Sequence, residues 1–203
     1  MEFSQTFWTV LEYFGVASGL LYLYYELRQK PQMWVLGLIS SGIYILVFAM
    51  ARIYADMCFN VYNVLISIYG LNQWRLSLRN QQKQTAQTRQ VEYYHTSSRV
   101  WCKVIASSLL LYGAIYYLLR TYTDSPIPLG DALTTSLSIV ATWMLAKRYL
   151  SHWLVWVVIN VASIWLYYQR GLYPTMILYA FYAAAAVFGY FIWKKNGIGY
   201  REK

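Results

Sequence analysis

Long apolar runs constrain the fold of this chain more than any other feature. An α-helix needs about 20 mostly apolar residues to cross a bilayer. Because no water reaches the hydrocarbon, each such run must bond its backbone groups internally, which predicts a helix. The sequence therefore predicts an all-α integral membrane protein with one membrane domain over residues 1–203. Its seven runs cover about residues 7–28, 33–51, 55–77, 100–121, 130–147, 151–169 and 173–194.

The distribution of positive charge predicts the orientation of the chain. Only 12% of the 203 residues are charged, about half of what a soluble domain carries. The net charge of +9 would suggest nucleic acid as the partner of a soluble protein. Here 14 of the 17 lysines and arginines fall on one side of the seven predicted helices, which is typical of the cytoplasmic side. We therefore expect the lipid bilayer and no nucleic acid as surroundings, with the N-terminus outside and the C-terminus in the cytoplasm.

The reactive residue types do not form a recognisable catalytic pattern. Cys58 and Cys102 lie in apolar runs and are typical of small hydrophobes rather than of a disulfide framework or a metal site. His95 falls in the polar segment 79–99, predicted to be an aqueous loop, and His152 falls at a helix start. The sequence has no glycine-rich phosphate loop, nucleophile elbow or zinc spacing. We expect no enzyme activity, no metal and no cofactor.

The chain matches itself when it is shifted by 119 residues without gaps. The two matching stretches, 7–77 and 130–194, predict a duplicated three-helix unit, with 100–121 as a linker helix between the copies. One intervening helix makes the copies parallel, which gives a 3+1+3 plan and favours a carrier with its substrate near the midplane. A duplicated structural or sensor protein is the alternative. The matches are Glu12 with Asp131, Arg28 with Lys147, Trp34 with Trp153, Tyr54 with Tyr173, Gly70 with Gly189, Trp74 with Trp193 and Arg75 with Lys194.

A polar face inside the apolar run 151–169 is the strongest candidate site. Spacings of 3, 4, 3 and 4 place five side chains on one helix face, namely Trp153, Trp156, Asn160, Ser163 and Tyr167. A buried amide needs a partner, so Asn160 is expected to face protein or a cavity. The indoles beside it suit a flat, cationic ligand. The alternative is a helix–helix contact held by Asn160 and Ser163.

A second set of polar residues would complete this ligand site. The run 55–77 carries the same spacing in Asn60, Asn63, Ser67, Gly70 and Trp74, with Gln73 near its inner end. Thr142 is a further candidate from the run 130–147, and Glu12 is a candidate for attracting a cation, although it could simply lie at the water interface. Each residue could instead serve interhelical hydrogen bonding. The repeat pairs Trp156 and Asn160 with Gly37 and Ser41, which predicts an asymmetric pocket, and Gly37, Ser40 and Ser41 are more typical of close helix packing.

Three segments resemble the PnuC-type vitamin transporters over about residues 10–195. They are Ser67–Trp74 with Tyr69-Gly70-Leu71-Asn72-Gln73, Leu137–Ala141, and Trp156–Val161 with its Trp-x-x-x-Asn motif. The resemblance implies an architecture similar to the SWEET sugar transporters and facilitated diffusion of an unphosphorylated vitamin, such as nicotinamide riboside, across the bacterial inner membrane. It also implies a cytoplasmic kinase that traps the product, no cofactor, and a homotrimer.

Two departures from the riboside pattern favour thiamine, the substrate of the related PnuT branch. Leu71 stands where the family motif usually has Trp, and residues 20–26 look more like the thiamine branch. The sequence-based hypothesis is therefore a thiamine uniporter in which Trp156 stacks on the heterocycle and Asn160 hydrogen-bonds its polar edge. Transport of nicotinamide riboside is the alternative substrate. An intramembrane ligand sensor is the alternative from another class.

Overall fold

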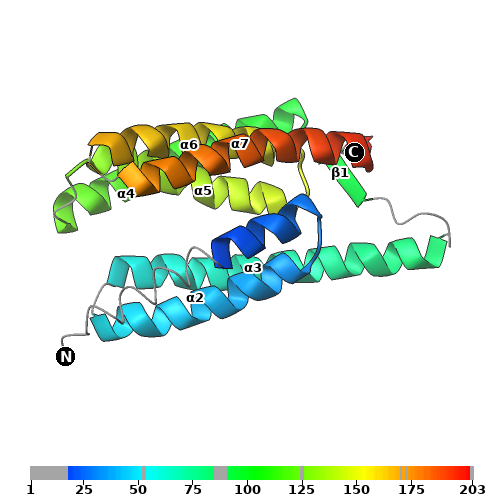
Figure 1. Cartoon of the computed structure of the whole chain (residues 1–203), viewed down its shortest axis with the longest axis horizontal. Helices are drawn as coiled ribbons and strands as arrows, with labels where there is room; N and C mark the ends of the chain where they lie inside the picture. The colour runs from blue at the N-terminus through cyan, green and yellow to red at the C-terminus, as the bar shows by residue number, and fades with distance from the viewer. Residues whose placement is uncertain are drawn as a thin grey trace. The chain divides into compact units, whose positions relative to one another are not determined.

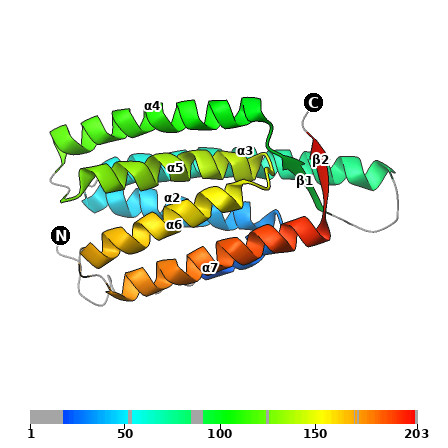
Figure 2. The ribbon, with the colours of Figure 1, turned by 90° about the horizontal axis from the view of Figure 1, so that it is seen from above.

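The computed structural model describes residues 18–51, 54–84, 91–123, 126–169, 171 and 173–201. The chain divides into two compact units, unit 1 over residues 1–88 and unit 2 over residues 89–203. Figures 1 and 2 show the whole chain from two directions, and each unit is described here by itself. Glu12 and the part of the predicted first span before residue 18 lie outside the described residues.

Unit 1 is helical throughout its described part. Residues 18–27 form a helical segment, followed by α2 (Gln32–Ala51) and α3 (Tyr54–Gln84), which pack against each other. Gly37 of α2 lies where these helices meet. A Cβ on Gly37 would lie 2.8 Å from Ser67 Oγ and 3.8 Å from the Tyr22 ring. The missing side chain thus permits close packing, as the small residues of this helix predicted.

Unit 2 contains four helices in its described part. They are α4 (Ser98–Tyr122), α5 (Pro128–Ala146), α6 (His152–Gln169) and α7 (Tyr173–Asn196). Successive helices pack on one another, and Figure 2 shows α4 beside α5 and α6 beside α7. An apolar cluster joins α4, α5 and α6 through Val100, Val104, Val140, Ala141, Met144, Tyr149, Val155 and Ile159. These bounds agree closely with the apolar runs, because each run ends where polar or turn-forming residues begin.

The hydropathy of the helices confirms a membrane protein, although not every predicted span. Among the described residues, α4, α5 and residues 176–196 of α7 are long and apolar enough to cross a bilayer, and residues 32–46 of α2 form a shorter apolar stretch. The remaining predicted spans, which carry more amide, hydroxyl and aromatic side chains, stay predictions.

The turn after residues 18–27 and the turn after α5 have the same hydrogen bonds. Lys30 N donates to Tyr25 O at 2.9 Å, and Tyr149 N, 119 residues later, donates to Met144 O at 3.0 Å. At the position before each donor, Gln29 has φ 51° and Arg148 has φ 59°. These are the bonds and the left-handed residue of a Schellman helix end. Glycine usually occupies that position, because it has no Cβ to strain.

Tryptophan pairs hold each unit at corresponding places. Trp34 and Trp74 join α2 to α3 with ring centroids 6.1 Å apart and planes at 80°. Trp153 and Trp193, each 119 residues later, join α6 to α7 with centroids 5.6 Å apart and planes at 88°. All four side chains are 1% exposed. Such edge-to-face packing matches the positive ring edge of one indole with the negative face of the other.

The prediction of an aqueous loop over residues 79–99 was wrong in part. Helix α3 continues to Gln84, and β1 (Val91–His95) follows. The helix extends because its Gln, Arg and Lys side chains are good helix formers that water can solvate. Strand β1 pairs in parallel with β2 (Gly197–Arg201), so the tail after the last helix is also ordered.

The outer edge of β1 bonds to the turn between α5 and α6. Tyr94 N donates to Arg148 O at 2.9 Å, and Leu150 N donates to Tyr94 O at 3.0 Å. The Thr96 hydroxyl donates to Ser151 Oγ at 2.8 Å. Strand β1 therefore ties the loop, the tail and this turn together at one end of unit 2.

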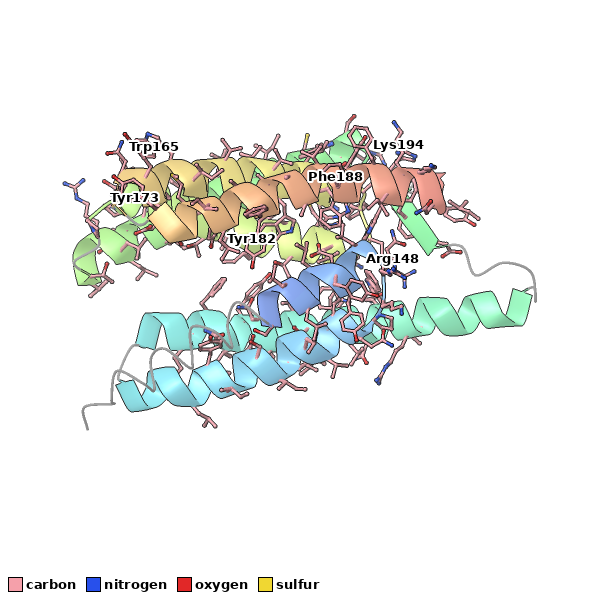
Figure 3. The ribbon with its side chains drawn as sticks, viewed as in Figure 1. Arg148, Trp165, Tyr173, Tyr182, Phe188 and Lys194 are labelled. Carbon is pink, nitrogen blue, oxygen red and sulfur yellow. The ribbon has the colours of Figure 1, made fainter. Side chains whose placement is uncertain are left out.

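Arg148 lies buried at the centre of this connection (Figure 3). Its side chain is 5% exposed, and burial lowers its pKa from 12.5 to about 10. Glu92 of β1 acts in the opposite direction, because a nearby carboxylate favours the charged guanidinium. The charge therefore persists at neutral pH.

Candidate functional site

The polar face of α6 lies inside the protein, as the sequence predicted. Asn160 and Ser163 are each 4% exposed, whereas Val158 and Val161 on the same helix are 56% and 55% exposed. The apolar residues are suited to lipid and the polar ones to a protein interior. A buried amide on such a face can bond a polar ligand edge.

Trp156 lies one turn before Asn160 and is partly buried. Its ring packs against the apolar cluster of α4, α5 and α6. That packing restricts the rotamers of the indole, and its partial exposure leaves ring surface free. A rigid aromatic wall beside an amide is suited to stacking a heterocycle.

Trp153, the other indole of this face, serves packing. It is 1% exposed, and its ring contacts those of His152 at 4.7 Å and Trp193 at 5.6 Å, while His152 and Trp193 contact each other at 4.8 Å. His152 Nδ1 lies 2.7 Å from Tyr149 O. Because a carbonyl oxygen can only accept a hydrogen bond, Nδ1 is the donor of this pair. Within the ranges that the structure describes, no three His, Cys, Asp or Glu side chains come close enough to hold a metal ion.

The polar face of α3 belongs to unit 1. Asn60, Asn63 and Gln73 are partly buried, while Ser67 is 4% exposed. Trp74, also predicted to line the site, is 1% exposed against Trp34, so its observed role is packing. Each of these three amide side chains therefore keeps part of its surface exposed.

Of two further predicted site residues, the structure describes Thr142 and does not describe Glu12. Thr142 is partly buried, and its hydroxyl donates to Ser138 O of the same helix at 2.8 Å. Such a bond satisfies the hydroxyl within the helix, while leaving an acceptor lone pair. Glu12 falls outside the described residues, so its predicted role stays a prediction.

A tyrosine cluster between α6 and α7 was missed by the sequence analysis. It consists of Tyr167, Tyr179 and Tyr182, all partly buried. The rings of Tyr167 and Tyr179 have centroids 4.9 Å apart, with planes at 41°. Tyr179 and Tyr182 are 5.8 Å apart with planes at 74°. The 119-residue shift places Tyr179 and Tyr182 at the positions that Asn60 and Asn63 occupy in the first repeat. Because those asparagines were predicted site residues, the shift could have pointed to the two tyrosines.

The long apolar helices and the buried polar face of α6 are typical of a multi-pass membrane protein. The description "Nicotinamide mononucleotide transporter" belongs to a family model that matches residues 9–195. The chain belongs to this family of membrane transporters, which excludes the enzyme class.

Known relatives agree over most of the chain. The nicotinamide riboside transporter PnuC of Neisseria mucosa is 28% identical over 189 residues, which are 89% of this chain and 70% of that protein. The protein of the same name from Escherichia coli K12 is 22% identical over 205 residues, 90% of this chain and 84% of its own length. The crystal structure of the vitamin B3 transporter PnuC is similar with a TM-score of 0.65 and 27% identity, covering 88% of this chain and 77% of that one.

Proposed function

We propose that this protein carries nicotinamide riboside across the bacterial inner membrane by facilitated diffusion. The observation that carries the proposal is the family membership together with relatives named for this riboside along about nine-tenths of the chain. The preference for thiamine, which rested on Leu71 and residues 20–26, finds no support among those relatives. Nicotinamide riboside, the alternative substrate of the sequence analysis, is therefore the substrate that we propose.

The chemistry of the riboside matches the polar face of α6. Its nicotinamide ring is a flat pyridinium cation with a carboxamide. In the proposed site Trp156 stacks on the ring, where a cation gains from the indole face. Asn160 pairs with a polar group of the substrate, because an amide supplies both a donor and an acceptor. The burial of Asn160 makes that pairing count for more than it would in water.

Asn60, Asn63, Ser67 and Gln73 of α3, and Thr142 of α5, stay candidates for polar contacts with a substrate, as the sequence predicted. Trp74 would support the site by packing, and Glu12 would attract the cation at the outer end. These roles follow from residue type and helix position.

The proposed architecture is seven spans in a 3+1+3 plan with parallel repeats, similar to the SWEET transporters. Its support is the recurrence, 119 residues apart, of the Trp34–Trp74 pair in Trp153–Trp193 and of the Schellman helix end. Transport would then proceed by rocking of one three-helix unit against the other. The charge distribution supports an external N-terminus and a cytoplasmic C-terminus.

Facilitated diffusion needs a trap inside the cell to accumulate its substrate. We propose that a cytoplasmic kinase phosphorylates the riboside and so prevents its return. A homotrimer is part of the same proposal. The exposed leucines of α4, Leu109 at 66% and Leu110 at 76%, support a surface that is covered by lipid or by a second copy.

Binding to the purified protein tests the substrate and the site together. Isothermal titration in detergent would compare nicotinamide riboside, nicotinamide mononucleotide and thiamine. We expect the riboside to bind with the highest affinity, and Asn160→Ala to weaken it about tenfold or more, since losing a buried hydrogen-bond partner costs about 1–3 kcal/mol. Val158→Ala is the matched control on the lipid-suited face. Tighter binding of thiamine than of the riboside would contradict the proposed substrate. Unchanged riboside affinity of the Asn160→Ala variant would contradict the proposed role of Asn160.

A further inference from the structure

Both ends of the α6–α7 pair are held by aromatic side chains, but the two sets differ in exposure. At one end, Trp153 and Trp193 are each 1% exposed. At the other end, Tyr167, Tyr179 and Tyr182 are only partly buried and keep ring surface accessible. A cluster needed for packing alone would be expected to resemble the first set. The second combines accessible aromatic faces with phenolic hydroxyls.

The position of the tyrosine cluster relative to Asn160 indicates a separate binding station. Tyr167 follows Asn160 by seven residues, which is two helical turns on the same face and about 10 Å of rise. Tyr182 lies on α7, three residues after Tyr179, and is labelled in Figure 3. With the topology proposed above, this end of the pair is the outer one.

The ring contacts within the cluster leave one tyrosine best placed for a ligand. The rings of Tyr167 and Tyr179 pack against each other with centroids 4.9 Å apart and planes at 41°, so each supports the other. Tyr182, which is partly buried, stands edge-on to Tyr179 with centroids 5.8 Å apart. Two ring planes that meet at 74° present an aromatic corner, the arrangement that attracts a cation to ring faces.

We propose that Tyr179 and Tyr182, held by Tyr167, form an entry station that binds the flat pyridinium cation before it reaches Asn160. This inference rests on the proposed function. The station selects cationic heterocycles by ring stacking and cation–π attraction, without a charged residue in the membrane. The corresponding positions of unit 1 are the amides Asn60 and Asn63, so the two repeats offer a substrate different chemistry.

The test measures initial uptake of nicotinamide riboside by the full-length protein in liposomes. Tyr182→Leu removes the aromatic face, and we expect the KM to rise about tenfold with little change in the maximal rate, the effect of losing one aromatic contact of about 1.4 kcal/mol. Tyr182→Phe keeps the ring and should stay within about twofold of the original KM. The matched control is Tyr173→Leu, at the same end of α7 and 56% exposed. It should leave the KM unchanged.

Each outcome separates the station from the proposed function. If the unaltered protein takes up no riboside, the proposed function fails and the station fails with it. If the unaltered protein takes up riboside and Tyr182→Leu leaves its KM unchanged, the station alone fails. An equal rise in KM for Tyr173→Leu would also reject it, since both tyrosines would then act as an interfacial belt. Melting temperatures within a few degrees of one another would exclude misfolding, and Tyr179→Phe provides a second, milder variant.

Discussion

Alanine at Gly70 tests whether the tryptophan packing fixes the helix pairs. A Cβ on Gly70 would lie 2.5 Å from two atoms of the Trp34 indole. Carbon atoms prefer about 3.5–4.0 Å, so the overlap is about 1 Å. The indole cannot easily move away, because it is 1% exposed and stands edge-on to Trp74.

The expected change in stability is the difference between two opposing effects. Overpacking of this kind costs about 1–3 kcal/mol. Replacing a helical glycine by alanine gains about 1 kcal/mol through helix propensity. Gly113 of α4 is the matched control, because a Cβ there would meet nothing within 4 Å. Gly113→Ala should therefore show the gain without the cost.

Thermal unfolding in detergent, followed by tryptophan fluorescence, would measure both variants. For a chain of this size 1 kcal/mol corresponds to about 2–4 °C, so Gly70→Ala should melt about 5 °C below Gly113→Ala. Gly189→Ala repeats the test in unit 2, where a Cβ would lie 2.6 Å from the Trp153 ring. Equal melting temperatures for Gly70→Ala and Gly113→Ala would refute the reasoning.

Three other predictions concern the turn, the strand pair and the site. Gln29→Gly should be about 1 kcal/mol more stable than Gln29→Ala in the same melting assay, because only glycine is unstrained at φ 51°; equal stability would contradict this. Gly199→Ala should separate β2 from β1, since a Cβ would lie 2.8 Å from His95 Nε2; faster hydrogen exchange at the Tyr93 and His95 amides, which lie on the side of β1 away from the Tyr94–Arg148 bond, would reveal it, and unchanged rates would exclude it. Asn160→Asp should reduce riboside uptake at least tenfold at neutral pH, because a carboxylate cannot donate the bond that an amide donates; uptake restored in mildly acidic buffer would agree, and full activity at neutral pH would not.

The helices were predictable because hydropathy and helix ends are local properties of the sequence. The run 100–121 became Ser98–Tyr122, and the run 151–169 became His152–Gln169. The 119-residue repeat also helped to predict which tryptophans occupy corresponding positions. Trp34 and Trp74 were matched with Trp153 and Trp193 by the shift alone, and both pairs are edge-to-face contacts in the structure.

The strand pair was not predictable in the same way. Strand β1 lies in a polar segment, and its partner β2 is about 100 residues further along the chain. Five-residue strands carry too little periodicity to stand out, and no local pattern reveals a pairing of such separation. The same argument applies to the bond between Tyr94 and the turn at Arg148, which depends on the fold of unit 2.

The candidate site was partly predictable from residue types. Helical spacing identified Asn160 and Ser163 as one face, and their burial agrees. Spacing alone could not show that Trp74 is 1% exposed and packs against Trp34, and its predicted place in the site stays a prediction. Spacing named Tyr167 only as part of the polar face of residues 151–169, and its contact with Tyr179 depends on how α6 meets α7.

Uptake of labelled nicotinamide riboside into sealed proteoliposomes, without any ion gradient, tests the central claim most directly. Saturable entry that stops when the internal and external concentrations are equal is the result that a riboside uniporter predicts. The same plateau should remain when a proton or sodium gradient is applied. Accumulation above the external concentration only under such a gradient would contradict facilitated diffusion, and entry of thiamine in place of the riboside would contradict the substrate.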